Sequence, residues 1–88
     1  MHVRFQGKKY QLIITDHARS RMELRNIDEE AVIDLLQTGQ IKEKPMKGKF
    51  WVFKQIGKNN EKSVCLSVSV ETPNLIVITA LVNWRPEL

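Results

Sequence analysis

A histidine and two arginines, His17, Arg21 and Arg25, recur at four-residue spacing near the start of the chain. On a helix these residues share one stripe, and Ala18 and Met22 lie beside it, toward an apolar core. Arginines are costly to hold against an apolar surface unless acceptors satisfy their donors. The spacing therefore indicates a helix face that meets an anion.

This stripe has some of the groups needed to cleave RNA without a metal. Such cleavage requires a base for the 2′-hydroxyl, cations for the charge of the phosphorane, and an acid for the leaving oxygen. We expect His17 to act as the base and Arg21 and Arg25 as the cations. The stripe contains no acid, so Arg85 or a lysine of residues 42–54 would have to supply one. A structural alternative stays open, in which the histidine caps the helix and the arginines pair with nearby carboxylates.

The charge distribution favours a polyanionic partner. The chain carries 14 Lys and Arg against 10 Asp and Glu, a net charge of +4. The excess positive charge falls in residues 1–25 and 42–62, while residues 26–41 hold acidic side chains and no basic ones. Nucleic acid is the partner that this asymmetry suggests, although a net charge of this size also serves solubility. The candidate contacts for a base and its phosphate are Lys49, Lys54, Trp51 and Arg85.

Composition narrows the class of protein. The 88 residues are enough for one domain, spanning residues 1–88. No apolar run approaches the roughly 18 residues that cross a bilayer, and the first residues lack the pattern of a secretory signal, so we expect a cytoplasmic protein with no membrane partner. The single cysteine, Cys65, and two histidines lack metal-ligand spacing, and we expect neither a metal nor another cofactor.

The pattern of short elements predicts an α+β domain. A hairpin turned at Gly7 precedes two helices, one capped by Thr15 or Asp16 and one capped by Asp28 and ended by a left-handed Gly39. The expected strands that follow cover residues 49–56, 63–70 and 75–83. We therefore expect two N-terminal helices packed on one face of an antiparallel sheet of about four strands, with the last strand central.

Residues 63–70 alternate almost perfectly between apolar and small polar side chains. The alternation predicts that the valines and the leucine face the helices and that Cys65, Ser67 and Ser69 face the other way. Trp51 is expected on the same side as these three residues. We expect this second face to be free for a ligand.

The first helix resembles that of a widespread family of small bacterial domains of unassigned function. The resemblance rests on the HAxxRMxxRxI motif that begins at His17, on the residues that follow it, Glu29-Glu30 and Val32, and on residues 75–79. In layout that family is similar to the RelE-like and BrnT-like ribonuclease toxins, which cut RNA, often ribosome-bound mRNA, with basic residues and no metal. The resemblance implies an RNA substrate, an acidic antitoxin partner, and the histidine and two arginines as the marked residues. The C-terminal strands depart from such toxins, because they are sparse in arginine and only Arg85 remains.

Two functions follow as expectations. The first is a metal-independent, toxin-type endoribonuclease that acts on RNA phosphodiesters. The alternative is a non-catalytic module that uses the same stripe to bind nucleic acid or an acidic protein, with salt-dependent affinity and no strand scission. A third possibility is that the stripe only holds the fold together.

Overall fold

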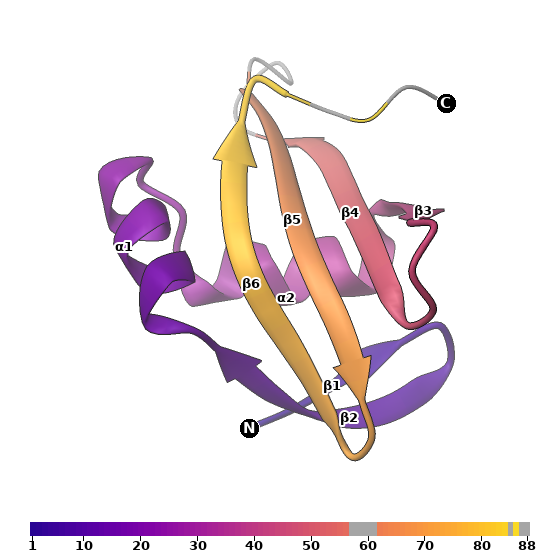
Figure 1. Ribbon diagram of the computed structural model, residues 1–88. Helices are drawn as coiled ribbons and strands as arrows, with labels where there is room; N and C mark the ends of the chain where they lie inside the picture. The colour runs from indigo at the N-terminus through magenta and orange to yellow at the C-terminus, as the bar shows by residue number, and fades with distance from the viewer. Residues whose placement is uncertain (57–61, 85, 87–88) are drawn as a thin grey trace.

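The protein is a mixed six-stranded sheet with two helices. The computed structural model describes residues 1–56, 62–84 and 86. The elements in chain order are β1 (His2–Phe5), β2 (Lys8–Ile14), α1 (Asp16–Leu24), α2 (Glu29–Thr38), β3 (Gln40–Glu43), β4 (Lys49–Ile56), β5 (Lys62–Glu71) and β6 (Asn74–Val82). The strand order across the sheet is β1-β2-β6-β5-β4-β3 (Figure 1).

The expected antiparallel sheet of about four strands is wrong. The N-terminal hairpin does not stand apart, because β2 pairs with β6 in parallel through residues 11–14 and 74–77. Both helices lie in the connection between β2 and the rest of the sheet, and a connection of this length permits a parallel pair. The short, polar strand β3 adds a sixth strand at the edge beside β4. Its charged sequence, QIKE, is typical of a protected edge and carries little strand signal.

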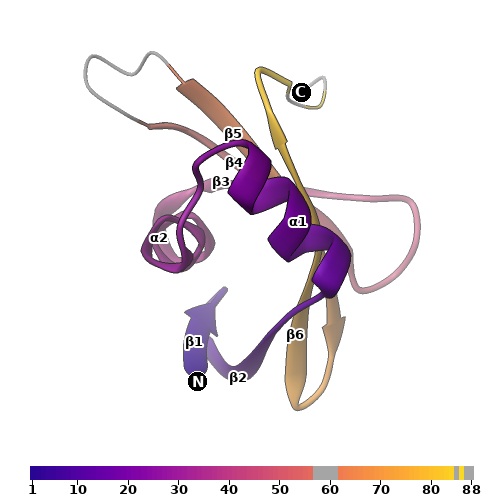
Figure 2. The ribbon, with the colours of Figure 1, turned by 90° about the vertical axis from the view of Figure 1, so that its left-hand side faces the viewer.

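The helices do not share one face of the sheet, which corrects the second part of that expectation. The sheet curls, and α2 lies in its concave side, where it contacts β1 and β4 (Figures 1 and 2). Helix α1 instead contacts β6 and lies along its edge, above the point where β2 leaves the sheet. Neither α1 nor α2 lies on the convex side of the sheet (Figure 1).

A β-bulge in β6 lies where the start of α1 contacts the sheet. The register between β5 and β6 shifts at Ser67 and Val68, which pair with Thr79 and Val77 and leave Ile78 as the extra residue. A bulge bends the strand and interrupts its ladder. The Thr15 hydroxyl lies 3.1 Å from the carbonyl oxygens of both Val77 and Ile78, to which it donates, and its backbone N–H donates to Val77. The start of α1 is therefore tied to β6 at the bulge.

The core lies between α2 and the concave side of the sheet. The predicted apolar face of the second helix is confirmed, since Val32, Leu35 and Leu36 are almost fully buried. They pack with Phe5 from the first strand and Leu66 from β5 in one cluster. The expected central position of β6 is also confirmed, because it lies between β2 and β5.

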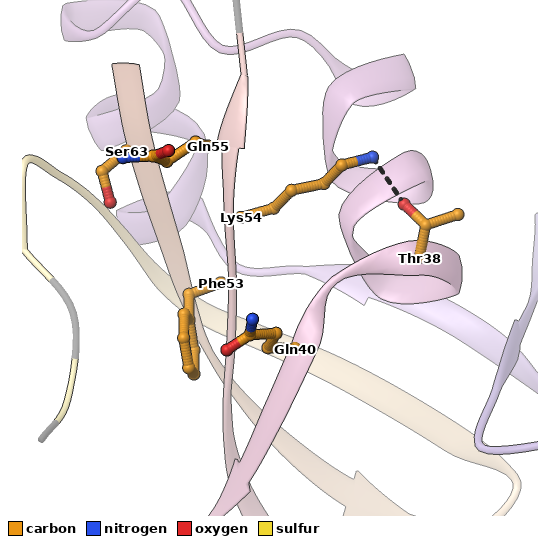
Figure 3. A pocket seen from close by; sticks show the side chains of 6 residues that line it. All are labelled: Thr38, Gln40, Phe53, Lys54, Gln55 and Ser63. Carbon is orange, nitrogen blue, oxygen red and sulfur yellow. Dashed lines mark hydrogen bonds between the residues drawn. The ribbon is translucent and has the colours of Figure 1, made fainter. Parts of the chain in front are cut away.

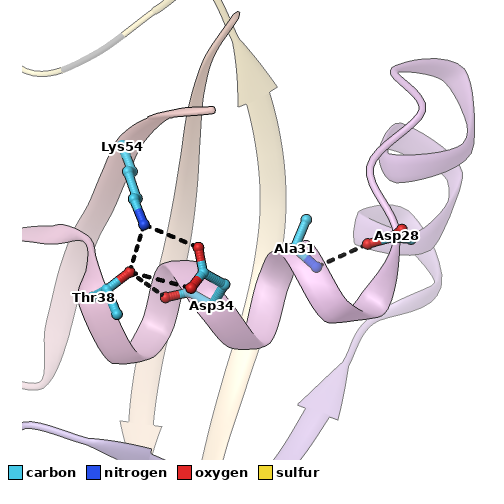
Figure 4. A network of polar contacts seen from close by, with 5 residues as sticks. All are labelled: Asp28, Ala31, Asp34, Thr38 and Lys54. Carbon is cyan, nitrogen blue, oxygen red and sulfur yellow. Dashed lines mark hydrogen bonds and ion pairs between the residues drawn. The ribbon is translucent and has the colours of Figure 1, made fainter. Parts of the chain in front are cut away.

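Most of the expected caps are confirmed. Thr15 accepts from the N–H of Ala18 at 3.0 Å, and Asp28 accepts from the N–H of Ala31 at 2.8 Å (Figure 4). Gly7 has φ +79°, as the hairpin turn requires.

The expected left-handed conformation of Gly39 is wrong. Its backbone is extended, with φ −73° and ψ 166°. An added Cβ would lie 2.6 Å from the carbonyl oxygen of Leu35 and 3.1 Å from that of Phe53. This glycine is needed for close backbone approach, because α2 passes directly into β3 without a left-handed turn.

None of the described segments forms a helix long and apolar enough to cross a membrane.

Candidate nucleic-acid interface

Helix α1 is oriented by its two small or flexible apolar residues. Ala18 and Met22 are buried in the core cluster, and Thr15 anchors the helix start. His17 and Arg21 are exposed, and Arg25 is half-buried. This gradation agrees with the helical wheel, on which Arg25 lies nearest the buried pair. The predicted stripe therefore exists as one side of α1, running from solvent at its start toward the core at its end.

The stripe carries no carboxylate partner among residues 1–56, 62–84 and 86. The ion pair on this helix joins Arg19 to Glu29 at 3.7 Å, and both side chains are about half exposed. Arg19 lies off the stripe, so this pair leaves Arg21 and Arg25 without a carboxylate partner among the described residues. The Nε atom of Arg25 is buried and has no hydrogen-bond partner within the described part of the chain.

A further cation joins the stripe from a distant part of the sequence. The amine of Lys62, at the start of β5, donates to the carbonyl oxygen of Arg25. Lys62 thereby satisfies a carbonyl at the C-terminal end of α1, where positive charge also complements the helix dipole. Nothing in the local sequence links residues 25 and 62, and sequence reasoning missed this contact.

A hollow beside α1 is not suited to an anion. It has a volume of about 180 Å³ and lies beside α1 on the side of the Arg19–Glu29 pair. Its lining combines three carboxylates and one guanidinium with two apolar side chains: Glu23, Asp28, Glu29, Arg19, Met22 and Ile27. The arrangement on α1 is thus an open, cationic helix side and not an enclosed pocket.

The candidate strand residues lie on opposite sides of the sheet. Trp51 pairs with Ser67, and Lys49 pairs with Ser69, so both point to the convex side. Lys54 points to the concave side, where its amine lies 3.0 Å from Asp34 and 2.8 Å from Thr38 of α2 (Figure 4). The structure therefore separates Lys54 from the other two, since an odd spacing along a strand reverses the side chain.

Arg85, the fourth strand-side candidate, lies outside the described residues. The described residues do not bring the candidates into one cluster. His17 and Arg21 lie on α1 and Arg25 is the residue that caps its C-terminal end, whereas Lys49 and Trp51 lie on β4, two strands away from β6 in the sheet.

The comparisons with known proteins identify a family. A family model described as a domain of unknown function (DUF4258) matches residues 14–82. The chain belongs to this family. No curated protein and no solved structure matched it. The expected membership of a family of small domains of unassigned function is therefore confirmed, while the resemblance to RelE-like and BrnT-like toxins has no support from these comparisons.

The convex side of the DUF4258 domain is more covered than its sequence indicates. Cys65, Ser67 and Ser69 do face away from α2, but they are 0%, 4% and 2% exposed. The expectation of a face free for a ligand is wrong for these residues, because long side chains from β4 and from the segment after β3 lie over them. Lys44 donates to the Ser67 hydroxyl at 2.5 Å, and Lys49 donates to the Ser69 hydroxyl at 2.8 Å.

Burial shifts the pKa of two groups on this side of the sheet. It lowers the pKa of the Lys44 amine, which the neighbouring Cys65 partly raises again and the Lys49 ammonium lowers further. Burial raises the pKa of the Cys65 thiol from 9.0 to about 11, against a smaller opposing effect of Lys44. A thiol in this state is a poor nucleophile at neutral pH. Burial therefore makes Cys65 an unreactive thiol at neutral pH.

Another hollow of the DUF4258 domain, about 240 Å³ in volume, lies where α2 passes into β3 (Figure 3). Phe53 and Gln40 line one end, and Lys54, whose amine is held by Thr38, lines another. Because this cation is already engaged by α2, the hollow offers no free charge to an anion. Within the described ranges, no three His, Cys, Asp or Glu side chains are grouped to hold a metal ion.

Proposed function

We propose that this domain is a metal-independent endoribonuclease that uses the exposed side of α1. The observation that carries the proposal is the stripe of His17, Arg21 and Arg25, on which no carboxylate of the described residues neutralises the positive charge. Charge left uncompensated on one helix side attracts a polyanion. An imidazole beside two guanidinium groups adds a titratable group to that attraction.

The chemistry follows from the positions along the helix. The His17 imidazole takes the proton of a ribose 2′-hydroxyl, and the 2′-oxygen attacks the adjacent phosphorus. Arg21 and Arg25 stabilise the charge that develops on the phosphorane oxygens. The bond to the 5′-oxygen then breaks, leaving a cyclic phosphate, and the leaving oxygen takes a proton from a protonated side chain. Lys62, at the end of the same stripe, is the described residue to test in that role, and Arg85 is the candidate outside the described residues.

This proposal includes a partner for the free protein. A surface with uncompensated arginines that cleaves RNA requires control in the cell. An acidic antitoxin protein that covers α1 would supply carboxylates to the stripe. Naked RNA and RNA on a translating ribosome are both substrates to test, since the open helix side would admit either one.

The decisive experiment is cleavage of a labelled transcript, naked and on translating ribosomes, in the presence of EDTA. We expect His17→Ala to lower the rate by about 10²–10⁴-fold, the usual contribution of a general base. Arg21→Gln should lower it by about 10²-fold. Arg19→Gln is the matched control, because it removes the same charge from the same helix but off the stripe, and should change the rate little. Intact RNA in both settings, or equal rates for the His17 variant and the unchanged protein, would contradict the proposal.

The alternative is a binding module that uses the same stripe without cleavage. It is favoured by the openness of the α1 surface, which lacks a described pocket to exclude water around a reacting group. In that case RNA binding weakens steeply with salt, by a slope of about −0.7 per phosphate contact, and the strand stays intact. Arg21→Gln then reduces the slope by about 0.7, the value of one phosphate contact, while His17→Ala has no effect on the length of the RNA.

A further inference from the structure

A second cationic cluster lies on the convex side of the sheet, on β4, β5 and the segment that follows β3. It contains two lysine–serine pairs, Lys44 with Ser67 and Lys49 with Ser69. The serines are two residues apart on β5, so their hydroxyls point to the same side of the sheet. The Ser69 hydroxyl also lies 3.1 Å from Glu71, to which it donates.

The cluster has more donors than acceptors. Each ammonium group has three N–H donors and no acceptor, and the described contacts use one donor of each lysine. Neither lysine has a carboxylate within ion-pair distance among the described residues. The nearby carboxylate of Glu71 is reached through the Ser69 hydroxyl and not by an amine. A phosphate group, which has several acceptor oxygens and a negative charge, complements this surplus.

Two tryptophans lie beside the same lysines. The amine of Lys44 lies 3.7 Å from the centre of the Trp51 ring. Trp84 packs edge-to-face on Trp51, with ring centres 4.8 Å apart, and remains 43% exposed. An exposed indole next to a cation is a platform on which a nucleobase stacks. Lys42 shares this side of the sheet, since it pairs with Trp51 across β3 and β4.

We infer that this convex surface binds a nucleotide of single-stranded RNA, with its phosphate at Lys44 and Lys49 and its base against Trp84. We call it the lysine–tryptophan site, formed by Lys44, Lys49, Ser67, Ser69, Trp51 and Trp84. The choice of RNA as the ligand rests on the proposed function, whereas the phosphate and the stacked base follow from the groups present. The site would hold the strand while the stripe on α1 acts on it.

A continuous strand fits this surface better than a free nucleotide. The site is a side of a sheet and not an enclosed pocket, so one phosphate and one base bury little area there. A strand adds neighbouring phosphates, which the Lys42 amine on the same side can meet. A duplex keeps its bases stacked on one another and cannot present one to the indole.

The two tryptophans of the chain, Trp51 and Trp84, are both in the proposed site. Intrinsic tryptophan fluorescence therefore reports on this surface alone. We expect titration of the full chain with an oligouridylate of eight or so nucleotides to quench the fluorescence at low salt, and the quenching to decrease as salt rises. Uridine monophosphate and inorganic phosphate should bind much more weakly, and an RNA duplex should not quench.

Single substitutions test which groups hold the phosphate and the base. Lys44→Gln and Lys49→Gln should each weaken binding about fivefold at 0.1 M salt, since one phosphate contact contributes a slope of about 0.7. Trp84→Ala should weaken it about tenfold, read from the remaining Trp51 signal. Lys8→Gln is the matched control, because Lys8 is exposed on β2 and the same charge is removed. Circular dichroism verifies that each variant is folded. If the Lys44→Gln variant does not fold, Lys49→Gln still tests the phosphate contact.

Three results would overturn the inference: no quenching by the oligonucleotide, equal affinity of the Lys44, Lys49 and Lys8 variants, or equal affinity for the strand and for free uridine monophosphate. Its failure can be distinguished from failure of the proposed function. His17→Ala should lower cleavage by about 10²–10⁴-fold, whereas the quenching, which reports on the convex side, should persist. Quenching without any cleavage by the unchanged protein would support the site and contradict the ribonuclease.

Discussion

Replacing Gly39 tests how α2 is joined to β3. The backbone angles of Gly39 are open to any residue, so Gly39→Ala introduces a steric problem and no torsional one. The new Cβ would lie 2.6 Å from the Leu35 carbonyl oxygen, about 0.8 Å short of the 3.4 Å at which ordinary contact begins. That oxygen also accepts the N–H of Gly39 at 2.7 Å. Relief of the clash therefore stretches the last hydrogen bond of α2 or moves it away from β4.

The size of the effect follows from these contacts. Overpacking of a well-packed site costs about 1–3 kcal/mol, and the upper part of this range applies because the obstructing atoms are backbone. Alanine also restricts the unfolded chain, which offsets about 0.4–1 kcal/mol. We expect a net loss of about 2 kcal/mol in the free energy of unfolding, or about 10 °C in Tm for a domain of this size. Urea denaturation should show a lower midpoint with an unchanged slope.

Substitution by asparagine, at Gly39 and at a control glycine, distinguishes a steric cause of the lost stability from a torsional one. Gly7, with φ +79° and nothing within 4 Å of an added Cβ, is the control. Gly7→Ala should cost about 1–2 kcal/mol, and Gly7→Asn clearly less, because asparagine tolerates the left-handed region. Gly39→Asn should instead be at least as harmful as Gly39→Ala. If asparagine were the better tolerated residue at position 39, the close-approach explanation would be wrong.

Other substitutions test the remaining contacts. Thr15→Val removes the cap of α1 and its bonds to β6 and should cost about 1–2 kcal/mol, against about 1 kcal/mol for the simpler cap in Asp28→Ala, both measured by urea denaturation. The Cys65 thiol has a raised pKa of about 11, so the folded chain retains a proton that the unfolded chain loses above pH 9.0. The neutral thiol therefore contributes about 2–3 kcal/mol to the free energy of unfolding, fully below pH 9 and less as pH rises through 11. Cys65→Val should remove this loss of stability at alkaline pH. A variant that loses as much stability there as the unchanged protein would contradict the role of Cys65. Lys54→Met should cost at most about 1 kcal/mol, because its ion pair with Asp34 is largely exposed, and a larger loss in thermal denaturation would refute that estimate.

Local structure was predictable from the sequence because its signals are local. Periodicity located the two helices and the strands β4, β5 and β6, and the capping residues Thr15 and Asp28 are where the helices begin. The partners of the strands were not predictable in the same way. The alternation of buried and exposed residues in β2 shows that one of its sides faces the core, but not that β6 is its neighbour in parallel. The charged sequence of β3 hides its pairing, since the alternation signal that identifies a strand depends on one buried side.

The candidate site residues also differ in whether local sequence signals could predict their positions. The stripe on α1 depends only on the helical period and on which side is apolar, and the exposure of His17, Arg21 and Arg25 follows the wheel. Strand alternation was already sufficient to separate Lys54 from Lys49 and Trp51, although the cluster of like charges in sequence suggested one surface. By contrast, Lys44 and Lys62 meet their partners across 23 and 37 residues of chain. No pattern in the sequence reports such pairs.

Buried polar residues were the signal that could have indicated the convex cluster. Ser67 and Ser69 lie in a central strand between β4 and β6, where a hydroxyl needs a hydrogen-bond partner once it is covered. Lysine is suited to this position, because its long apolar stem covers the sheet while its amine reaches the hydroxyl. The same contact that buries the serines leaves each ammonium with unused donors at the surface. The packing of the convex side and its capacity to hold a phosphate thus have one cause, and a Lys44→Met substitution should weaken both, because it leaves the Ser67 hydroxyl without its donor and the phosphate with Lys49 as the remaining lysine of the pair.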